Sequence, residues 1–171
     1  MNDEAVSPVI GVLLMLTLTL IIAAIVNNYA GGLVDTEPKA PSATIQVKYS
    51  QGGGMEIRHV SGDPIPTSSV KVIVRPSETM GRGASQYGSE LDKQYITNDI
   101  RNLSWSSGIT SFKVGDVSYV TATNISAVQG DIDKKFKFDD NSKQNNRGNT
   151  FYLELYYKNI MISRNEVLIE E

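Results

Sequence analysis

Cysteine is absent from the 171 residues and histidine occurs once, at His59. The first absence excludes disulfides, thiol chemistry and thiolate metal sites. The second excludes a histidine pair or a histidine-rich metal centre within one chain. No run or stripe of lysine and arginine is present, so nucleic acid is not expected as a partner.

Charge is also missing from one long segment. Between Ala5 and Val34 there is no acidic or basic residue. Residues 1–40 carry four acidic side chains and one lysine, a balance of −3. Subtracting these from the 19 acidic and 16 basic side chains of the whole chain leaves 15 of each in residues 41–171. The sequence therefore predicts an apolar helix in residues 1–31, a linker in 32–42 and one head domain in 43–171.

The charge-free segment has the features of one long helix. The 22 positions from Ala5 to Val26 would span about 33 Å as a helix, the thickness of a bilayer core. Ser7 is suited to the N-cap and Pro8 to the first helical position, where its missing N–H has no consequence. Gly31 and Gly32 can close the helix, and prolines follow shortly after.

Apolar side chains occur on every face of this predicted helix, which must then be surrounded by lipid or protein. We expect the following residues to be buried among helices: Val9, Ile10, Val12, Leu13, Leu14, Leu16, Leu18, Leu20, Ile21 and Ile25. Gly11, Ala23 and Ala24 are small enough to let helices approach closely.

Three roles for such a helix compete. A cleaved secretory signal fits poorly, because the apolar run is too long and neither lysine nor arginine precedes it. A single-pass membrane anchor is the simplest alternative, although an anchor usually carries basic residues on its cytoplasmic side. The third role is a helix that enters the membrane first and packs in a filament core later.

The segment Asp3–Leu16 closely resembles the N-terminal segment of archaeal type IV pilins, through the run Ala-Val-Ser-Pro-Val-Ile-Gly at residues 5–11. The resemblance implies a subunit of an extracellular, cell-surface filament that polymerises through its N-terminal helices, with adhesion as its role. It also implies a transient membrane stage, cleavage by a class III signal peptidase, and assembly by an ATPase and membrane platform. An archaellum-type motility subunit and a non-polymerising, membrane-anchored binding domain are the alternatives.

The rest of the chain reads as short strands, and the fold class expected is α+β. Antiparallel strands are predicted at Ala43–Ser50, Met55–Val60, Ser69–Arg75, Val117–Thr123, Lys135–Phe138, Thr150–Lys158 and Ile160–Ile169, with a turn at Asn159. Pro76–Gln94 and Asp139–Gly148 are predicted as loops. The resemblance implies an immunoglobulin-like β-sandwich for this head.

Few residues of the head suggest chemistry, and neither an enzyme nor a cofactor is expected. His59, Ser61 and Asp63 lie too close in sequence to form a triad assembled across a fold. The aspartates 131, 133, 139 and 140 lack the spacing of an EF-hand. Asn102 and Asn124 each begin an N-glycosylation sequon, so both are candidate glycan acceptors on an extracellular domain.

Overall fold

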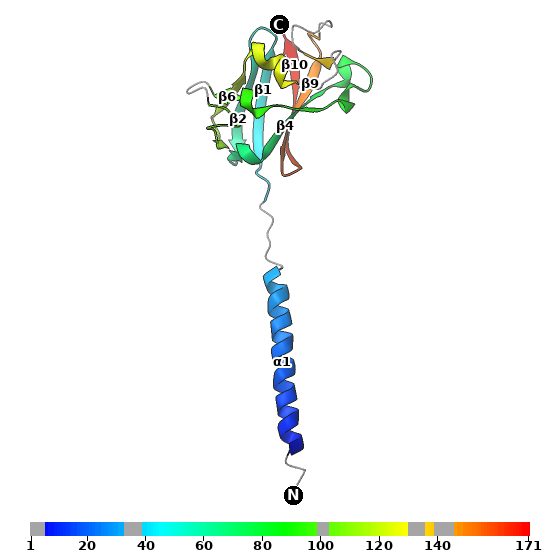
Figure 1. Ribbon diagram of the computed structural model, residues 1–171. Coiled ribbons are helices and arrows are strands. Elements are labelled where there is room, and N and C mark those ends of the chain that lie inside the picture. Colours follow the sequence, from blue (N-terminus) through cyan, green and yellow to red (C-terminus); the bar gives the residue numbers. More distant parts are fainter. Residues whose placement is uncertain (1–5, 33–38, 99–102, 130–135, 139–145) are drawn as a thin grey trace. The chain divides into compact units, whose positions relative to one another are not determined.

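The computed structural model describes residues 6–32, 39–98, 103–129, 136–138 and 146–171. The chain divides into two compact units, Met1–Lys39 and Ala40–Glu171. The first contains the helix α1 (Val6–Gly32), drawn as one continuous helix in Figure 1. The second, here called the head, is built from strands with short 3-10 turns and one four-residue helix, α2 (Ile125–Val128).

Ten strands form the described part of the head. They are β1 (Ala43–Ser50), β2 (Gly54–Gly62), β3 (Ile65–Pro66), β4 (Val70–Pro76), β5 (Ser89–Glu90), β6 (Thr97–Asn98), β7 (Ser111–Phe112), β8 (Val117–Val120), β9 (Thr150–Tyr157) and β10 (Ile160–Glu170). Eight of them are ordered β5-β4-β9-β10-β1-β2-β8-β6 in one sheet, and β3 pairs separately with β7. One helix followed by a mostly antiparallel sheet domain is the predicted α+β class.

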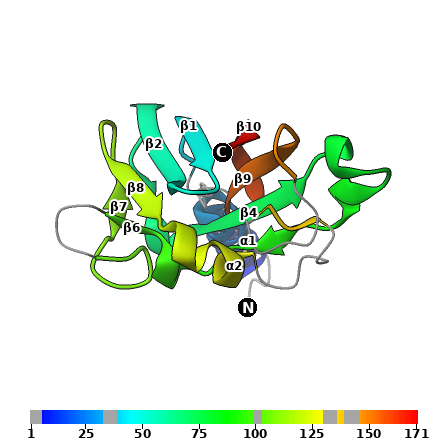
Figure 2. The same cartoon turned by 90° about the horizontal axis from the view of Figure 1, so that it is seen from above.

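The eight-stranded sheet has two halves, β5-β4-β9-β10 and β1-β2-β8-β6, which meet at a short parallel pairing. That pairing joins Tyr49 of β1 to Ile169 of β10 and Ser50 to Glu170. Figure 2 shows β2 and β8 on one side of the head and β9 and β10 on the other. The immunoglobulin-like description of this head stays a prediction.

A single hydrophobic core receives side chains from both halves of the sheet. Alternating residues of β4 and β9 point into it, as the period of two in a strand requires. Its largest fully buried side chains are Phe112, Phe138, Phe151, Met55, Ile57, Ile65, Leu91, Ile96, Ile125, Leu153, Leu155 and Ile169. A domain with such a core is expected to hold its fold by its own contacts.

Two turns fix the ends of strands. Lys158 and Asn159 both have positive φ, 45° and 70°, which is the geometry of a two-residue type I′ turn between β9 and β10. The predicted turn at Asn159 is thereby confirmed. At the end of β2, Gly62 has φ 110°, and a Cβ there would overlap the Ser42 carbonyl oxygen. Only glycine fits this turn.

Two predicted strands differ from the structure. The strand expected at Val117–Thr123 ends at Val120, because a 3-10 turn follows at Ala122–Asn124. The strand expected at Lys135–Phe138 is wrong for the described residues 136–138, which form no strand. The backbone N–H of Phe138 donates to Gln129 Oε1 at 2.9 Å, and its carbonyl accepts the Tyr49 hydroxyl at 2.9 Å. Side chains thus satisfy the backbone groups that a neighbouring strand would otherwise bind.

Phe138 is nevertheless held firmly in the core. Its ring stacks on Phe151 with centroids 4.3 Å apart and meets Tyr49 edge-on at 5.1 Å. The alternation of lysine and phenylalanine at residues 135–138 therefore predicted the buried side chains but not the backbone.

The predicted loop Pro76–Gln94 begins at the end of β4 and is more structured than expected. It contains 3-10 turns at Glu78–Met80 and Ala84–Gln86 as well as β5. Ala84 and Leu91 are buried in the core. In the loop predicted at Asp139–Gly148, residues 139–145 lie outside the described part of the chain.

Candidate assembly surface

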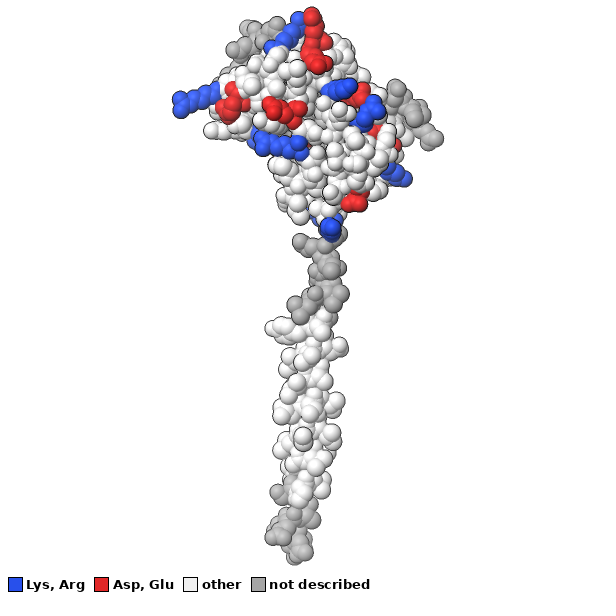
Figure 3. All heavy atoms as spheres, turned by 180° about the vertical axis from the view of Figure 1, so that it is seen from behind, with Lys and Arg blue, Asp and Glu red and all other residues white. Residues whose placement is uncertain are grey.

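The surface of α1 is apolar in every direction. All described side chains from Pro8 to Ala30 are exposed within the chain. Figure 3 shows no charged side chain on the helix face that it presents. The residues predicted to be buried among helices are between 50% and 69% exposed: Val9, Ile10, Val12, Leu13, Leu14, Leu16, Leu18, Leu20, Ile21 and Ile25. Their own chain provides nothing that covers them among the described residues.

The helix has the length and composition needed to cross a membrane. Pro8–Ala30 comprises 23 residues, or about 35 Å at the usual rise of an α-helix. A bilayer core is about 30 Å thick, so this segment matches it. Tyr29, near the C-terminal end, is 73% exposed, and an aromatic ring with a hydroxyl suits a membrane–water boundary.

Two threonines interrupt the apolar run without leaving a polar group unsatisfied. The Thr17 hydroxyl donates to the Leu14 carbonyl at 2.9 Å, and the Thr19 hydroxyl donates to the Leu16 carbonyl at 2.9 Å. Both hydrogen bonds stay within the helix, so these side chains can enter lipid or a helix bundle at little cost. The apolar pattern alone does not predict this role, although a threonine three residues after any helical carbonyl can play it.

The helix begins two residues before the predicted first helical position. α1 begins at Val6, so Ser7 and Pro8 are its second and third residues rather than cap and first position. Pro8 is still tolerated there, because the first four N–H groups of a helix have no partner within it. The Ser7 side chain lies outside the described residues, and its capping role stays a prediction.

Gly11, Ala23 and Ala24 are the predicted close-packing positions, and all three lie within α1 and are exposed. A Cβ added at Gly11 would meet nothing within 4 Å in this chain. The small size of this residue therefore has no internal explanation, which leaves contact with another helix as the expected reason.

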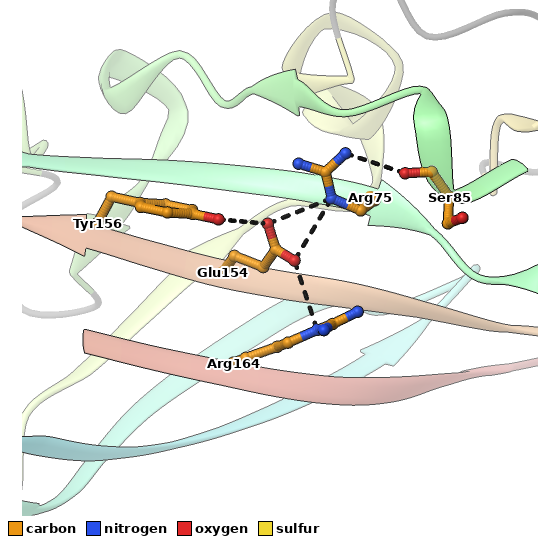
Figure 4. A network of polar contacts seen from close by, with 5 residues as sticks. All are labelled: Arg75, Ser85, Glu154, Tyr156 and Arg164. Atoms are coloured by element: carbon orange, nitrogen blue, oxygen red, sulfur yellow. Dashed lines mark hydrogen bonds and ion pairs between the residues drawn. The ribbon is translucent and has the colours of Figure 1, made fainter. Parts of the chain in front are cut away.

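The main polar cluster of the head surrounds Glu154 on β9 (Figure 4). This carboxylate is 2% exposed and forms ion pairs with Arg75 Nε at 3.3 Å and Arg164 Nε at 3.4 Å. The Tyr156 hydroxyl donates to it at 3.2 Å, and Arg75 Nη1 donates to the Ser85 carbonyl at 2.9 Å. The cluster links β4, β9, β10 and the loop after β4 on the face of the sheet away from the core.

Two further interactions complete this cluster. The Arg164 guanidinium lies over the Tyr152 ring, 4.0 Å from its centroid. Burial, with the adjacent Glu154 carboxylate as a second cause, raises the pKa of Tyr156 above its ordinary value. The buried carboxylate is paired with two arginines, so we interpret the cluster as a structural link between strands. A lone glutamate between tyrosines in β9 was the only sequence signal for it.

A second carboxylate orders the loop after β4. Glu78 accepts from the Gly83 N–H at 2.8 Å and from the Ser85 hydroxyl. These hydrogen bonds, that of Ser85 first, hold the pKa of Glu78 below its ordinary value of 4.5.

The residues considered for hydrolysis have structural contacts instead. His59 is buried, with Nδ1 3.1 Å from the Phe112 carbonyl and Nε2 3.1 Å from the Ser61 carbonyl. The Asp63 carboxylate accepts the Ser42 N–H at 3.0 Å, while its own N–H donates to the Ser42 carbonyl at 2.7 Å. Asp63 thus holds the end of β2 beside the start of β1, and His59 links β2 to β7.

The structure describes only some of the residues predicted as candidates for metal binding or glycosylation. No group of three or more metal-binding side chains occurs within the described residues, and the aspartates 131, 133, 139 and 140 lie outside them. The sequon residue Asn124 is half-buried at the junction of a 3-10 turn and α2. Asn102 lies outside the described residues. Glycosylation at both sites stays a prediction.

Comparison with known proteins identifies the first segment. Residues 4–45 match the family model of the archaeal type IV pilin N-terminal domain, which confirms the resemblance read from the motif. An Archaeoglobus fulgidus protein with no assigned function is 42% identical over 80 residues, covering 46% of this chain and 57% of that protein. The chain thus matches little more than half the length of this relative.

Proposed function

We propose that this chain, whose residues 4–45 match the archaeal type IV pilin N-terminal domain, is a structural subunit of an extracellular, type IV pilus-like filament. In this proposal α1 is held in the membrane before assembly and is then buried among the helices of identical subunits. The single observation that carries the proposal is the surface of α1, which is apolar on all faces and uncovered within its own chain.

The free energy gained when α1 leaves water differs from the free energy gained when it leaves lipid for a helix bundle. Removing each large apolar side chain from water is worth about 1.5–3 kcal/mol, so the helix is not stable in water alone. In lipid that gain already exists, and transfer into a bundle adds mainly close packing. Extraction from the membrane then needs an external energy source, which fits the assembly ATPase and platform that the resemblance implies. The same reasoning makes a finished filament resistant to loss of subunits.

Identical subunits that repeat the same contact determine the geometry of the assembly. A surface that meets a different surface of the next copy generates an open helical polymer unless the rotation closes a ring. A class III signal peptidase would release the precursor, and the heads would form the outer surface on which adhesion depends. We propose no bound cofactor for the chain itself.

A charge placed in the middle of α1 tests this proposal. Leu16→Lys would bury an unpaired ammonium in the helix bundle, and we expect it to abolish filaments in electron micrographs of sheared cells. The matched control is Leu168→Lys, the same change at an exposed leucine of β10. Normal filaments from Leu16→Lys would contradict the proposed packing.

A second variant distinguishes two roles for this chain, a filament subunit and a single-pass anchor that never polymerises. Gly11→Leu keeps the helix apolar, and a Cβ at this position meets nothing within 4 Å in its own chain. Membrane insertion should therefore be preserved while close helix packing is blocked. We expect normal amounts of the chain in the membrane fraction and a loss of filaments. An anchored binding domain would show no change in either.

A further inference from the structure

The strand β10 has one edge that is largely open. Its other edge pairs with β9 along most of the strand. On the open side, among the described residues, β1 joins β10 only at Ile169 and Glu170. Figure 4 shows β10, in pale red, as the outermost of three neighbouring strands, with β9 in orange and β4 in green. An open strand edge can take up another strand through its backbone groups.

The backbone groups on this open edge belong to alternate residues of β10. The Ile169 N–H donates to the Asn149 carbonyl on the β9 side, whereas the Glu170 carbonyl accepts an N–H from the residue after β1. Successive residues of a strand direct their N–H and C=O groups to opposite edges. No register shift interrupts β10 after Ser163. The backbone groups of Arg164 and Glu166 therefore point to the open edge.

The side chains at this edge carry opposite charges two positions apart. The Arg164 side chain is 47% exposed, and Glu166 is exposed as well. Each has one contact already, Arg164 with Glu154 and Glu166 Oε1 with the Thr150 hydroxyl at 2.8 Å. A guanidinium has five N–H donors and a carboxylate has two acceptor oxygens, so both can bind a further partner.

Two copies of β10 match each other in one antiparallel register. When Asn165 lies opposite Asn165 of the second copy, each Arg164 lies opposite a Glu166, and two ion pairs form. The neighbouring two-fold registers place Arg164 opposite Arg164 or Glu166 opposite Glu166, which is unfavourable. In the first register the outward backbone groups of Arg164 and Glu166 also face each other as a hydrogen-bonded pair. The edge is thus complementary to itself in charge and in backbone.

We propose that β10 pairs antiparallel with β10 of a second copy, with Arg164 opposite Glu166 twice. A two-fold contact closes on two copies, so it cannot extend a filament whose subunits all point one way. It can join the heads of two filaments that lie side by side in opposite directions. This bundling rests on the proposed filament, whereas the pairing of heads does not need it. The competing explanation is that the two charges only protect the edge from pairing.

A cysteine at Asn165 tests the register, because the chain has no cysteine of its own. Residues opposite each other at such a non-hydrogen-bonded position have Cα atoms about 4.5 Å apart, within the range of a disulfide. The full Asn165→Cys chain is oxidised in detergent micelles, and we expect a disulfide-linked dimer on a non-reducing gel. Leu168→Cys is the matched control on the same strand. Its two copies would lie about 20 Å apart, so no dimer is expected.

Charge reversal tests the ion pairs. Glu166→Arg, added to the Asn165→Cys chain, places arginine opposite arginine twice and should slow dimer formation about tenfold. Glu90→Arg makes the same reversal on β5 and should have no effect. Arg164→Glu chains should also dimerise poorly alone. Mixed with Glu166→Arg chains, they should form dimers again, because both opposite-charge pairs are restored.

Electron micrographs add a measurement that needs no cysteine. Filaments of the parent chain should lie in bundles, and filaments of Glu166→Arg should lie singly. Single parent filaments, or bundles that Glu166→Arg leaves unchanged, would overturn the proposed bundling. If Asn165→Cys changes the fluorescence of the buried Trp105, and so the fold, this comparison decides alone.

Three results in micelles would overturn the pairing. One is the absence of a dimer from a folded Asn165→Cys chain. Another is an equal yield of dimers from Leu168→Cys. The third is a dimer that Glu166→Arg does not weaken. Dimers in micelles from a chain that forms no filaments in cells would instead contradict the proposed function and leave the pairing supported.

Discussion

The helix α1 exposes its apolar side chains, whereas the head buries most of its own. In the head, side chains such as Leu153 and Phe151 are fully buried by strands of the same chain. In α1, side chains of the same kind such as Leu18 and Leu20 are more than half exposed. The head therefore buries its large apolar side chains within its own chain, whereas those of the helix stay exposed, and we propose that lipid or other subunits cover them.

The comparison is most sharply tested by the same substitution in each region. Leu153→Ala would leave a cavity in the head core and lower its free energy of unfolding by about 3 kcal/mol. Leu18→Ala should leave that value unchanged, because Leu18 is not one of the residues of the head core. Thermal unfolding in detergent, followed by the fluorescence of the single, buried Trp105, measures both. Equal destabilisation by the two variants would mean that the regions are not independent.

The helix and the head also differ in charge. The helix α1 contains no charged residue, whereas the head buries the Glu154 carboxylate. Glu154→Gln keeps the size of the side chain but removes the charge that pairs with Arg75 and Arg164. We expect a loss of about 2 kcal/mol in unfolding free energy, with the partly exposed arginines limiting the damage. Glu90→Gln, which breaks an exposed ion pair with Lys71, should change it by less than about 1 kcal/mol. A larger effect at Glu90 would argue against the buried cluster as a stabilising link.

The smallest expected effect concerns pH. Because the folded pKa of Glu78 is lowered, its ionised form stabilises the head at pH values above the unfolded pKa. That contribution is lost as the pH falls through the folded pKa. The Tm of Glu78→Gln should therefore be slightly below that of the parent at pH 7, and the gap should narrow as the pH falls below the unfolded pKa. A gap that widens in acid would contradict the assigned hydrogen bonds.

The local sequence pattern predicted those elements whose own residues show a distinct composition or periodicity. The charge-free run predicted α1, and alternation predicted β1 with its observed bounds and β9 and β10 to within a residue. Long-range pairing was not predictable in this way. The Glu154 cluster depends on the register that sets Arg75 opposite Tyr152, and Arg164 opposite Glu154. The path of Phe136–Phe138 depends on Gln129 and Tyr49, whose side chains replace a neighbouring strand.

The central claim is that every face of α1 is covered by other subunits once the chain leaves the membrane. Because the chain has no cysteine, single cysteines can be placed at Val12, Leu13 and Leu18 on different faces of α1, and at exposed Ser106 as a control. Filaments sheared from cells without detergent are then treated with a water-soluble maleimide. The account predicts labelling at residue 106 alone. Labelling on any face of α1, or no chain in the sheared fraction, would contradict it.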